Sequence, residues 1–129
     1  LICSHMFISK KLNFIRQFTA SEIPFSMIFR KDVRFPHAVG VVVAESAKIG
    51  SGVCVWSNVT IGGKENGKET FYPVIEDDVQ IMSGAKIIGN VRIGKGAVIG
   101  AGALILKDVP AGAVVVSKNE QIILTNNLK

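Results

Sequence analysis

The sequence predicts an all-β fold in which short parallel strands wind into a solenoid, with a short helix at the N-terminal end. The main observation is a six-residue repeat, in which an aliphatic residue opens each block and Ala or Val follows four positions later. Glycines recur at the second and fourth places of several blocks, where corners need permissive backbone angles. An amphipathic helix would instead require apolar spacings of three and four residues. The repeat therefore predicts three short strands in each coil.

The repeat is clearest between residues 43 and 110. Its fifth positions are small and apolar throughout, at Ala47, Val53, Val59, Val79, Ala85, Val91, Ala97, Ala103 and Val109. It continues weakly upstream through Ile23, Phe29 and Phe35, with Met27 and Val33 at the fifth places. Polar residues at the sixth positions are expected to point outward. About ten to eleven strands, or between three and four coils, follow from this repeat length.

The chain is expected to form one domain of three segments, because 129 residues are too few for two independent cores. Residues 1–22 are predicted to be helical, with a short helix over Phe7 to Phe18 that caps the open end of the solenoid. Residues 23–116 are predicted to form the solenoid, and residues 117–129 a C-terminal tail. Within that tail, Gln121 to Leu124 is a candidate last strand.

Composition excludes several classes of protein. Hydrophobic residues make up 48% and charged residues 19%, which excludes an intrinsically disordered chain. The longest uncharged apolar stretch, Gly96 to Leu106, is too short and too rich in glycine to span a bilayer. The two cysteines, Cys3 and Cys54, form no disulfide framework and no secretory signal pattern is present, so the expected location is cytoplasmic.

The net charge of +5 is concentrated near one end. Residues 1–36 hold six lysines and arginines against two acidic residues, whereas the rest of the chain is nearly balanced. This excess could attract a phosphate-bearing ligand or an anionic membrane surface, which leaves a peripheral membrane contact open, but a solvated basic face is the simpler interpretation. Nucleic-acid binding is not expected, because the aromatic residues do not alternate with the basic ones and no binding motif is recognisable.

The repeat breaks at two places, and these breaks are candidate functional sites because the coils of a solenoid are otherwise interchangeable. Phe35 to Val43 spans eight residues where six are expected, and the two extra residues fall beside His37. Ile61 to Ile75 spans fourteen residues where twelve would keep the phase. The polar stretch within it, residues 64–72, is predicted to be an extruded loop.

His37 is a candidate general base, because an imidazole exchanges protons near neutral pH and can accept one from an attacking hydroxyl. From the residues alone, a histidine in a surface turn remains the simpler interpretation. The only other histidine, His5, lies outside the repeat. A catalytic zinc site needs about three protein ligands, so no metal is expected.

Four segments together resemble a known family. They are E-I-P from Glu22, F-P-H-x-x-G-V-V-V at residues 35–43, V-T-I-G-G at residues 59–63 and S-G-A-K-I-I-G-N-V at residues 83–91. They resemble the serine acetyltransferase branch of the hexapeptide-repeat acyltransferases, and most of all those members that acetylate sugar hydroxyls during surface-polysaccharide assembly. The resemblance implies a left-handed parallel β-helix and a homotrimer with active sites between protomers.

The resemblance also implies catalytic roles for two residues. His37 stands where the family has its general base, which removes the proton of the acceptor hydroxyl as that hydroxyl attacks the thioester of acetyl-CoA. Glu22 stands where the family has an acidic residue that orients this histidine. A solvated carboxylate at a helix end is the alternative for Glu22. Acetyl-CoA is then the expected acyl donor.

The acceptor site is where the chain departs from the serine-specific members. Those members carry an Arg-His pair before the proline that follows the extruded loop, whereas Phe71 and Tyr72 precede Pro73 here. An aromatic pair cannot clamp a carboxylate as an arginine does, but it can stack on a sugar ring. Phe71, Tyr72 and Trp56 are therefore the predicted acceptor-binding residues, with packing at a protomer interface as the alternative for all three.

Four positions are predicted to contact acetyl-CoA. In the family the pantetheine arm lies along a groove between two β-helices, where small residues let it approach the backbone. The matching positions are Gly63, Ser83 and Ala101. Lys107 or Lys118 is a candidate for the nucleotide phosphates on charge alone.

These observations favour an acetyl-CoA-dependent O-acetyltransferase that acts on a sugar or a surface-polysaccharide precursor, either a small molecule or a glycan. A serine O-acetyltransferase with an altered site is one alternative, weakened by Phe71 and Tyr72. A non-catalytic β-helix scaffold is the other, and the bulge at His37 disfavours it.

Overall fold

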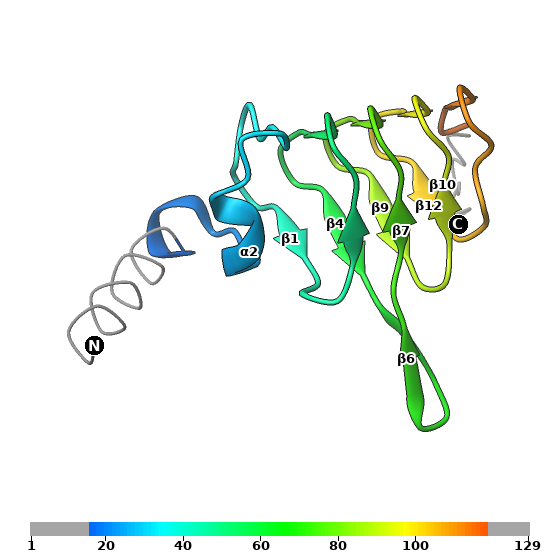
Figure 1. Ribbon diagram of the computed structural model, residues 1–129, viewed down its shortest axis with the longest axis horizontal. Coiled ribbons are helices and arrows are strands. Elements are labelled where there is room, and N and C mark those ends of the chain that lie inside the picture. Colours follow the sequence, from blue (N-terminus) through cyan, green and yellow to red (C-terminus); the bar gives the residue numbers. More distant parts are fainter. Residues whose placement is uncertain (1–15, 119–129) are drawn as a thin grey trace, which may run out of the picture.

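The computed structural model describes residues 16–118, and within them eleven short strands wind into a parallel β-helix (Figure 1). One sheet holds β1 (Val42–Val43), β4 (Thr60–Gly62), β9 (Lys86–Ile88) and β12 (Leu104–Ile105). The second holds β2 (Lys48–Ile49), β7 (Val74–Ile75) and β10 (Arg92–Ile93). The third holds β3 (Cys54–Val55), β8 (Gln80–Ile81), β11 (Val98–Ile99) and β13 (Val114–Val115). This strand number lies within the range that the repeat predicts.

Successive coils stack in register. Ile81 pairs with Ile99, so one regular coil takes eighteen residues, or three blocks of six. Backbone N–H groups of one coil donate to carbonyls of the next, as Gln80 N–H does to the Ala97 carbonyl at 2.9 Å. The six-residue period of the sequence is therefore the length of one strand with one corner.

The first and fifth positions of the repeat fill the interior. The fifth positions from Ala47 to Val109 are all buried. The isoleucines at first positions that are at most 1% exposed are Ile61, Ile75, Ile81, Ile87, Ile93 and Ile99. Residues of the same kind stack on one another in successive coils. Each coil thus covers the apolar surface of its neighbour, and this burial stabilises the solenoid. Of the polar sixth positions expected to point outward, Lys48, Lys86 and Arg92 are exposed and Gln80 is half-buried. Cys54, also at a sixth position, is buried.

Some corners require a left-handed backbone conformation. Asn58 has a φ of 56° and Asp78 a φ of 58°, and Asn and Asp tolerate this region better than most residues. Glycine occupies the matching place one coil earlier. A Cβ on Gly40 would overlap the Asn58 side chain, and a Cβ on Gly52 would overlap the Asp78 carboxylate. These corner glycines therefore provide space for the polar side chain of the next coil.

The first coil keeps the buried fifth positions of the repeat but not its strands. Residues at this point form the short helix α2 (Phe25–Ile28), and Phe29, a predicted first position, is 68% exposed. Pro24 precedes the helix with a φ of −55°, an angle that proline fixes and that suits a helix start. The predicted fifth positions Met27 and Val33 are nevertheless buried. The weak upstream continuation of the repeat therefore holds for its fifth positions but not for Phe29.

Two backbone bridges attach this first coil to the regular ones. Glu22 pairs with Val42, and Arg34 pairs with Cys54, twenty residues further along in each case. This coil is thus two residues longer than a regular one. The excess equals the two extra residues that the sequence places beside His37.

Parts of both terminal segments lie outside the described residues. Of the helix predicted over Phe7 to Phe18, only the end lies within them, and residues 16–19 are helical. The candidate strand from Gln121 to Leu124 lies wholly outside them. The boundaries proposed between the three segments therefore remain predictions.

The predicted extruded loop is a β-hairpin of β5 (Lys64–Asn66) and β6 (Glu69–Phe71), which projects away from the coils (Figure 1). Its two-residue turn begins at Gly67, whose φ of 65° suits glycine. The coil that holds the hairpin runs from Ile61 to its register partner Ile87, a distance of twenty-six residues. This coil is therefore eight residues longer than a regular coil of eighteen, whereas the spacing of the repeat indicates an excess of two. The hairpin leaves and rejoins the coil at neighbouring points, so its residues add to the coil and replace none of it.

Candidate active site

His37 lies in the bulge that lengthens the first coil, and its side chain is exposed. Hydrogen bonds hold the bulge backbone on both sides. Val39 N–H donates to the His37 carbonyl at 2.8 Å, and Asn58 N–H donates to the Val39 carbonyl at 2.8 Å. The imidazole of His37 is therefore accessible and stands on a backbone corner that hydrogen bonds hold in place. A side chain that contacts a substrate needs both properties.

The ring of Trp56 lies against that imidazole. The ring centroids of His37 and Trp56 are 5.6 Å apart, and the ring planes are inclined at 45°. Trp56 directly follows Val55, a core residue of β3. Its Nε1 is buried with no hydrogen-bond partner among the described residues, a situation that costs about 1–3 kcal/mol. Trp56 is thus beside the candidate base, and its part in acceptor binding stays a prediction.

A serine that the repeat does not reveal supports the bulge. Ser21 is 2% exposed and is the only buried polar or charged residue in the described part of the chain. Its hydroxyl donates to the Ala38 carbonyl at 2.9 Å and accepts a hydrogen bond from Val41 N–H at 3.0 Å. Gly40 N–H adds a bond to the Thr19 carbonyl at 2.9 Å. A single serine outside the repeat has no periodic signal, so sequence reasoning had no means of finding it.

Glu22 lies beside the strand that follows the bulge, since its backbone pairs with Val42 of β1. Its side chain is exposed and lines a cavity of about 400 Å³ together with Arg16 and Glu45. Within residues 16–118, no ion pair or hydrogen bond joins its carboxylate to His37. The structure therefore shows no direct bond within the predicted pair, and the orienting role of Glu22 stays a prediction.

Two of the predicted acetyl-CoA positions continue the edge on which His37 lies. The register of β1, β4, β9 and β12 places four residues at one corner of successive coils, namely Val39, Ser57, Ser83 and Ala101. The hydroxyls of Ser57 and Ser83 are 3.1 Å apart, and Gly102 N–H donates to the Ser83 carbonyl at 2.9 Å. Ser83 and Ala101 are exposed, so this edge presents small residues to the outside.

Gly63 and Tyr72 meet at the base of the hairpin. A Cβ on Gly63 would lie 2.7 Å from Tyr72 Cε1 and 2.9 Å from Thr70 Cγ2, closer than side chains allow. Contact with the Tyr72 ring therefore already explains this glycine within one chain. Phe71 lines a cavity of about 370 Å³ that also includes Asn90.

The sheet β1-β4-β9-β12 divides the predicted site residues of one chain into two groups. His37, Trp56, Ser83 and Ala101 lie on the side where the chain enters this sheet. The hairpin and its neighbours follow β4, where the chain leaves the sheet. The exposed Lys107 follows β12 on that same side and borders a cavity of about 360 Å³. One chain by itself therefore does not gather these residues around a single cavity.

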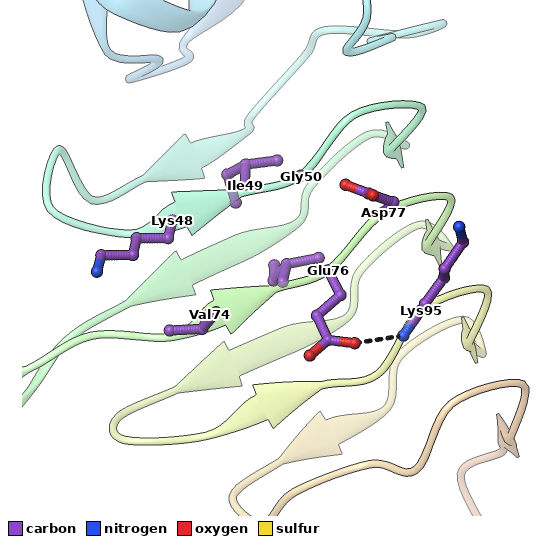
Figure 2. A pocket seen from close by; sticks show the side chains of 8 residues that line it. Lys48, Ile49, Gly50, Val74, Glu76, Asp77 and Lys95 are labelled. Atoms are coloured by element: carbon purple, nitrogen blue, oxygen red, sulfur yellow. Dashed lines mark hydrogen bonds between the residues drawn. The ribbon is translucent and has the colours of Figure 1, made fainter.

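A further cavity, of about 340 Å³ beside β2 and β7, contains none of the predicted site residues (Figure 2). Glu76 accepts hydrogen bonds from Arg92 Nη1 at 2.8 Å and from Lys95 N–H at 2.9 Å, and these bonds lower the pKa of Glu76. Asp77 accepts a bond from Ser51 N–H at 2.9 Å. These carboxylates tie neighbouring coils together, so they serve the stacking.

Among residues 16–118, no three His, Cys, Asp or Glu side chains group as ligands for a metal ion. No helix in the same range has the length and apolar character to cross a membrane.

Comparison with known proteins gives consistent results. The family model for the bacterial transferase hexapeptide (six repeats) matches residues 72–107. The serine acetyltransferase of Bacillus pumilus is 39% identical over 98% of this chain, and that of Bacillus licheniformis is 42% identical over 95%. The chain spans only 62% and 57% of the length of these two relatives.

A solved structure extends the similarity to the coordinates. The crystal structure of Neisseria gonorrhoeae serine acetyltransferase in complex with serine superposes with a TM-score of 0.61 and 40% sequence identity. The similarity covers 67% of this chain and 35% of that one. The two sequence relatives and this structural neighbour therefore all carry the name serine acetyltransferase.

The predicted sugar or polysaccharide acceptor is therefore wrong, and the predicted glycan partner with it, because the relatives are serine acetyltransferases. The error arose from Phe71 and Tyr72, since an aromatic ring can pack within its own chain, as Tyr72 does on Gly63. The predicted left-handed parallel β-helix is confirmed. The repeat, the coils and these comparisons together show that the chain belongs to the hexapeptide-repeat transferases.

Proposed function

We propose that this protein acetylates serine, moving an acetyl group from acetyl-CoA to the side-chain hydroxyl of the amino acid. The observation that carries the proposal is the identity of 39% and 42% to two serine acetyltransferases, over 98% and 95% of the chain. Coverage this complete includes the bulge at His37 and the hairpin. Because the chain spans 62% and 57% of those relatives, the activity, the substrates and the assembly are all part of the proposal.

In the proposed reaction His37 is the general base. Its imidazole takes the proton of the serine hydroxyl while the hydroxyl oxygen attacks the carbonyl carbon of the thioester. The carbon–sulfur bond then breaks, and the imidazolium returns the proton to the departing thiolate, so that O-acetylserine and CoA are released. The exposure of His37 and the hydrogen bonds of its corner support this role.

Glu22 is the proposed partner of that base. A carboxylate bonded to the imidazole would fix its tautomer and stabilise the imidazolium that forms during attack. Support comes from the pairing of the Glu22 backbone with Val42, five positions after His37, and from the exposed carboxylate.

Acetyl-CoA is the proposed donor, lying along the edge that Ser83 and Ala101 form. Small side chains there would let the pantetheine arm approach the backbone, whose N–H groups can polarise the thioester carbonyl. Gly63 is proposed to contact the arm from the hairpin side. The exposed Lys107 is the proposed partner of the nucleotide phosphates.

Trp56, Phe71 and Tyr72 are the proposed walls of the serine site. The contact between Trp56 and His37 supports this for Trp56, since an acceptor at the base would meet that ring. Phe71 and Tyr72 stand where serine-specific members are expected to carry Arg and His. The carboxylate of serine therefore needs a different partner in this protein, and weak binding of serine is the expected consequence.

A homotrimer with active sites between protomers is the proposed assembly. One sheet separates the His37 edge from the hairpin within a chain, so a second copy could bring a hairpin to that edge. Val42 and Leu104 of this sheet are 36% and 60% exposed, and an apolar outer face is expected where protomers meet. Sedimentation equilibrium tests this, and a fully active monomer would contradict it. The cytoplasm stays the predicted location.

The activity is tested by the release of CoA thiol from acetyl-CoA with L-serine as acceptor. L-alanine, which lacks the hydroxyl, is the matched control acceptor, and simple sugars form a second panel. Release that requires serine supports the proposal, whereas release only with a sugar contradicts it. Absence of release from protein that binds acetyl-CoA would contradict serine as acceptor, and absence of binding would favour a non-catalytic scaffold.

A double variant sharpens the test of the acceptor site. Phe71→Arg with Tyr72→His restores the pair expected in serine-specific members. A charged hydrogen bond contributes about 1.5–3 kcal/mol, so the KM for L-serine should fall about tenfold or more. An unchanged KM would mean that these two positions do not face the acceptor.

A further inference from the structure

The corner before β1 is closed differently from the matching corners before β9 and β12. In those two corners a direct backbone hydrogen bond closes the turn, from Ala85 N–H to the Met82 carbonyl and from Ala103 N–H to the Gly100 carbonyl, both at 3.2 Å. The strand register places Val41 in line with Ala85 and Ala103. The equivalent bond would therefore run from Val41 N–H to the carbonyl three residues earlier.

The hydroxyl of Ser21 stands between those two groups. Val41 N–H donates to Ser21 Oγ at 3.0 Å, and Ser21 Oγ donates to the Ala38 carbonyl at 2.9 Å, with the Thr19 carbonyl at 3.2 Å as a second acceptor. A hydroxyl can donate and accept at the same time. Two hydrogen bonds through an oxygen atom thus replace one direct bond, and they hold this turn wider than a direct bond would.

Burial makes this arrangement effective. Ser21 is 2% exposed, and hydrogen bonds shielded from water constrain geometry more strongly than exposed ones. The constraint acts at the Ala38 carbonyl, in the residue directly after His37. The Trp56 ring, whose centroid lies 5.6 Å from that of the imidazole, also limits where this side chain can turn.

We infer that Ser21 is a positioning residue for His37: its hydroxyl holds the corner open and so sets the direction in which the imidazole leaves the coil. The inference rests on the proposed role of His37 as general base. Without the hydroxyl, Val41 N–H and the Ala38 carbonyl can form the direct bond that closes the corners before β9 and β12. The coil then stays folded, but the backbone that carries the imidazole moves.

The kinetic test compares Ser21→Ala with Ser21→Thr in acetyl transfer from acetyl-CoA to L-serine. Ser21→Ala is expected to lower kcat about 10- to 100-fold with little change in either KM, because misplacing a reacting group by about 1 Å has effects of this size. Ser21→Thr keeps the hydroxyl and is expected to retain most of kcat.

Two control variants separate positioning from stability. Ser51→Ala removes a hydroxyl that bonds Asp32 at 2.9 Å in a different corner, and Val79→Ala removes buried methyl groups far along the chain from the bulge. Neither should lower kcat. A wild-type kcat in folded Ser21→Ala, or an equal loss in Val79→Ala, would overturn the inference. If Ser21→Ala fails to fold, Ser21→Cys takes its place, since a thiol has a similar shape but bonds weakly, and a wild-type kcat there would also overturn it.

A measurement without substrate distinguishes this inference from the proposed function. The imidazole C–H NMR signals of His37, assigned with a His37→Asn variant, report where the ring lies, and the exchange rate of the Val41 amide reports its hydrogen bond. If the wild-type protein does not acetylate serine, the proposed function fails on its own. Shifted His37 signals in Ser21→Ala, with unshifted ones in Ser51→Ala, still support the positioning role, and unshifted His37 signals in Ser21→Ala overturn it.

Discussion

Two regions of the β-helix close their corners in different ways. In the regular region from β7 to β13, the corners at Ala85, Ala97, Ala103 and Ala113 are closed by a direct backbone hydrogen bond, as when Ala97 N–H donates to the Gly94 carbonyl at 3.1 Å. The register there advances by eighteen residues. In the first coil the advance is twenty residues, and α2 takes the place of a strand. There the corner depends on the hydroxyl of Ser21, which accepts a hydrogen bond from the Val41 amide, twenty residues further along the chain. The regular region needs only its repeat, whereas the first coil needs a specific side chain.

The difference shows how a solenoid makes room for chemistry. In a regular coil the first and fifth positions are committed to the interior and the backbone is committed to its neighbours. Two additional residues release part of the backbone from that pairing, so that a side chain can stand away from the surface. Function at His37 and stability in β7 to β13 should therefore be separable by substitution.

His37→Ala should break the function of the irregular region with the largest effect. Turnover is expected to fall about 10²- to 10⁴-fold, because the acceptor hydroxyl loses its general base. The side chain is exposed, so the free energy of unfolding should stay within about 0.5 kcal/mol of the wild-type value. Thiol release and urea unfolding of the same samples measure both quantities. Undiminished turnover would remove His37 from the mechanism.

Ile87→Ala should do the opposite, by damaging the regular region. Ile87 is fully buried, so its truncation is expected to lower the free energy of unfolding by about 2–5 kcal/mol. Phe29→Ala is the matched control from the irregular region, because Phe29 is 68% exposed. Chemical denaturation at one protein concentration compares them. Equal losses in the two variants would contradict the division of the molecule into these regions.

Glu22→Gln tests whether the irregular region contains a second functional group. We expect a fall in kcat of about 10- to 1000-fold, smaller than for His37→Ala, because the base remains but loses its orienting carboxylate. Glu45→Gln is the control, since Glu45 lines the same cavity. A wild-type rate in Glu22→Gln would mean that the Glu22 backbone, and not its carboxylate, is what matters.

Glu76→Gln should have the smallest effect, confined to stability. The bonds from Arg92 and Lys95 lower the pKa of Glu76, so the ionised form is favoured by folding. This contribution is complete above the unfolded pKa of about 4.3 and is lost as the pH falls through the folded value. The variant should therefore melt slightly below the wild type at neutral pH, and the two should converge in acid.

Thermal melts at neutral pH and at about pH 3 measure this difference. Glu65→Gln in the exposed strand β5 is the control, and it should melt like the wild type at both values. A difference between Glu76→Gln and the wild type that persists in acid would show that lost packing, and not the ionised carboxylate, is responsible.

The sequence alone predicts the regular region well. The fifth positions of the repeat are buried, and the charged sixth positions Lys48, Lys86 and Arg92 face outward, because each residue needs only its place within six. The extruded segment is also located correctly at residues 64–72. Its length is misjudged by six residues, because spacing does not distinguish a hairpin added to one coil from a longer path along it.

The candidate site is predictable only in part. His37 stands out because the period breaks beside it. The acceptor prediction from Phe71 and Tyr72 fails, because two aromatic residues are compatible with stacking on a ligand and with packing on their own chain. Ser21 gives no signal at all, because a buried hydroxyl is recognised by its partners and not by its position in a repeat.

The sequence by itself therefore determined the coil, its inward faces and the places where it breaks, because these depend on distances of one strand and one corner along the chain. Only the tertiary structure decided that the Trp56 ring lies against His37 and that the Ser21 hydroxyl opens the corner beside it. Each of these contacts joins residues nearly twenty positions apart, on different coils. Their proximity is set by the register in which the coils stack, and that register exists only once the chain has folded.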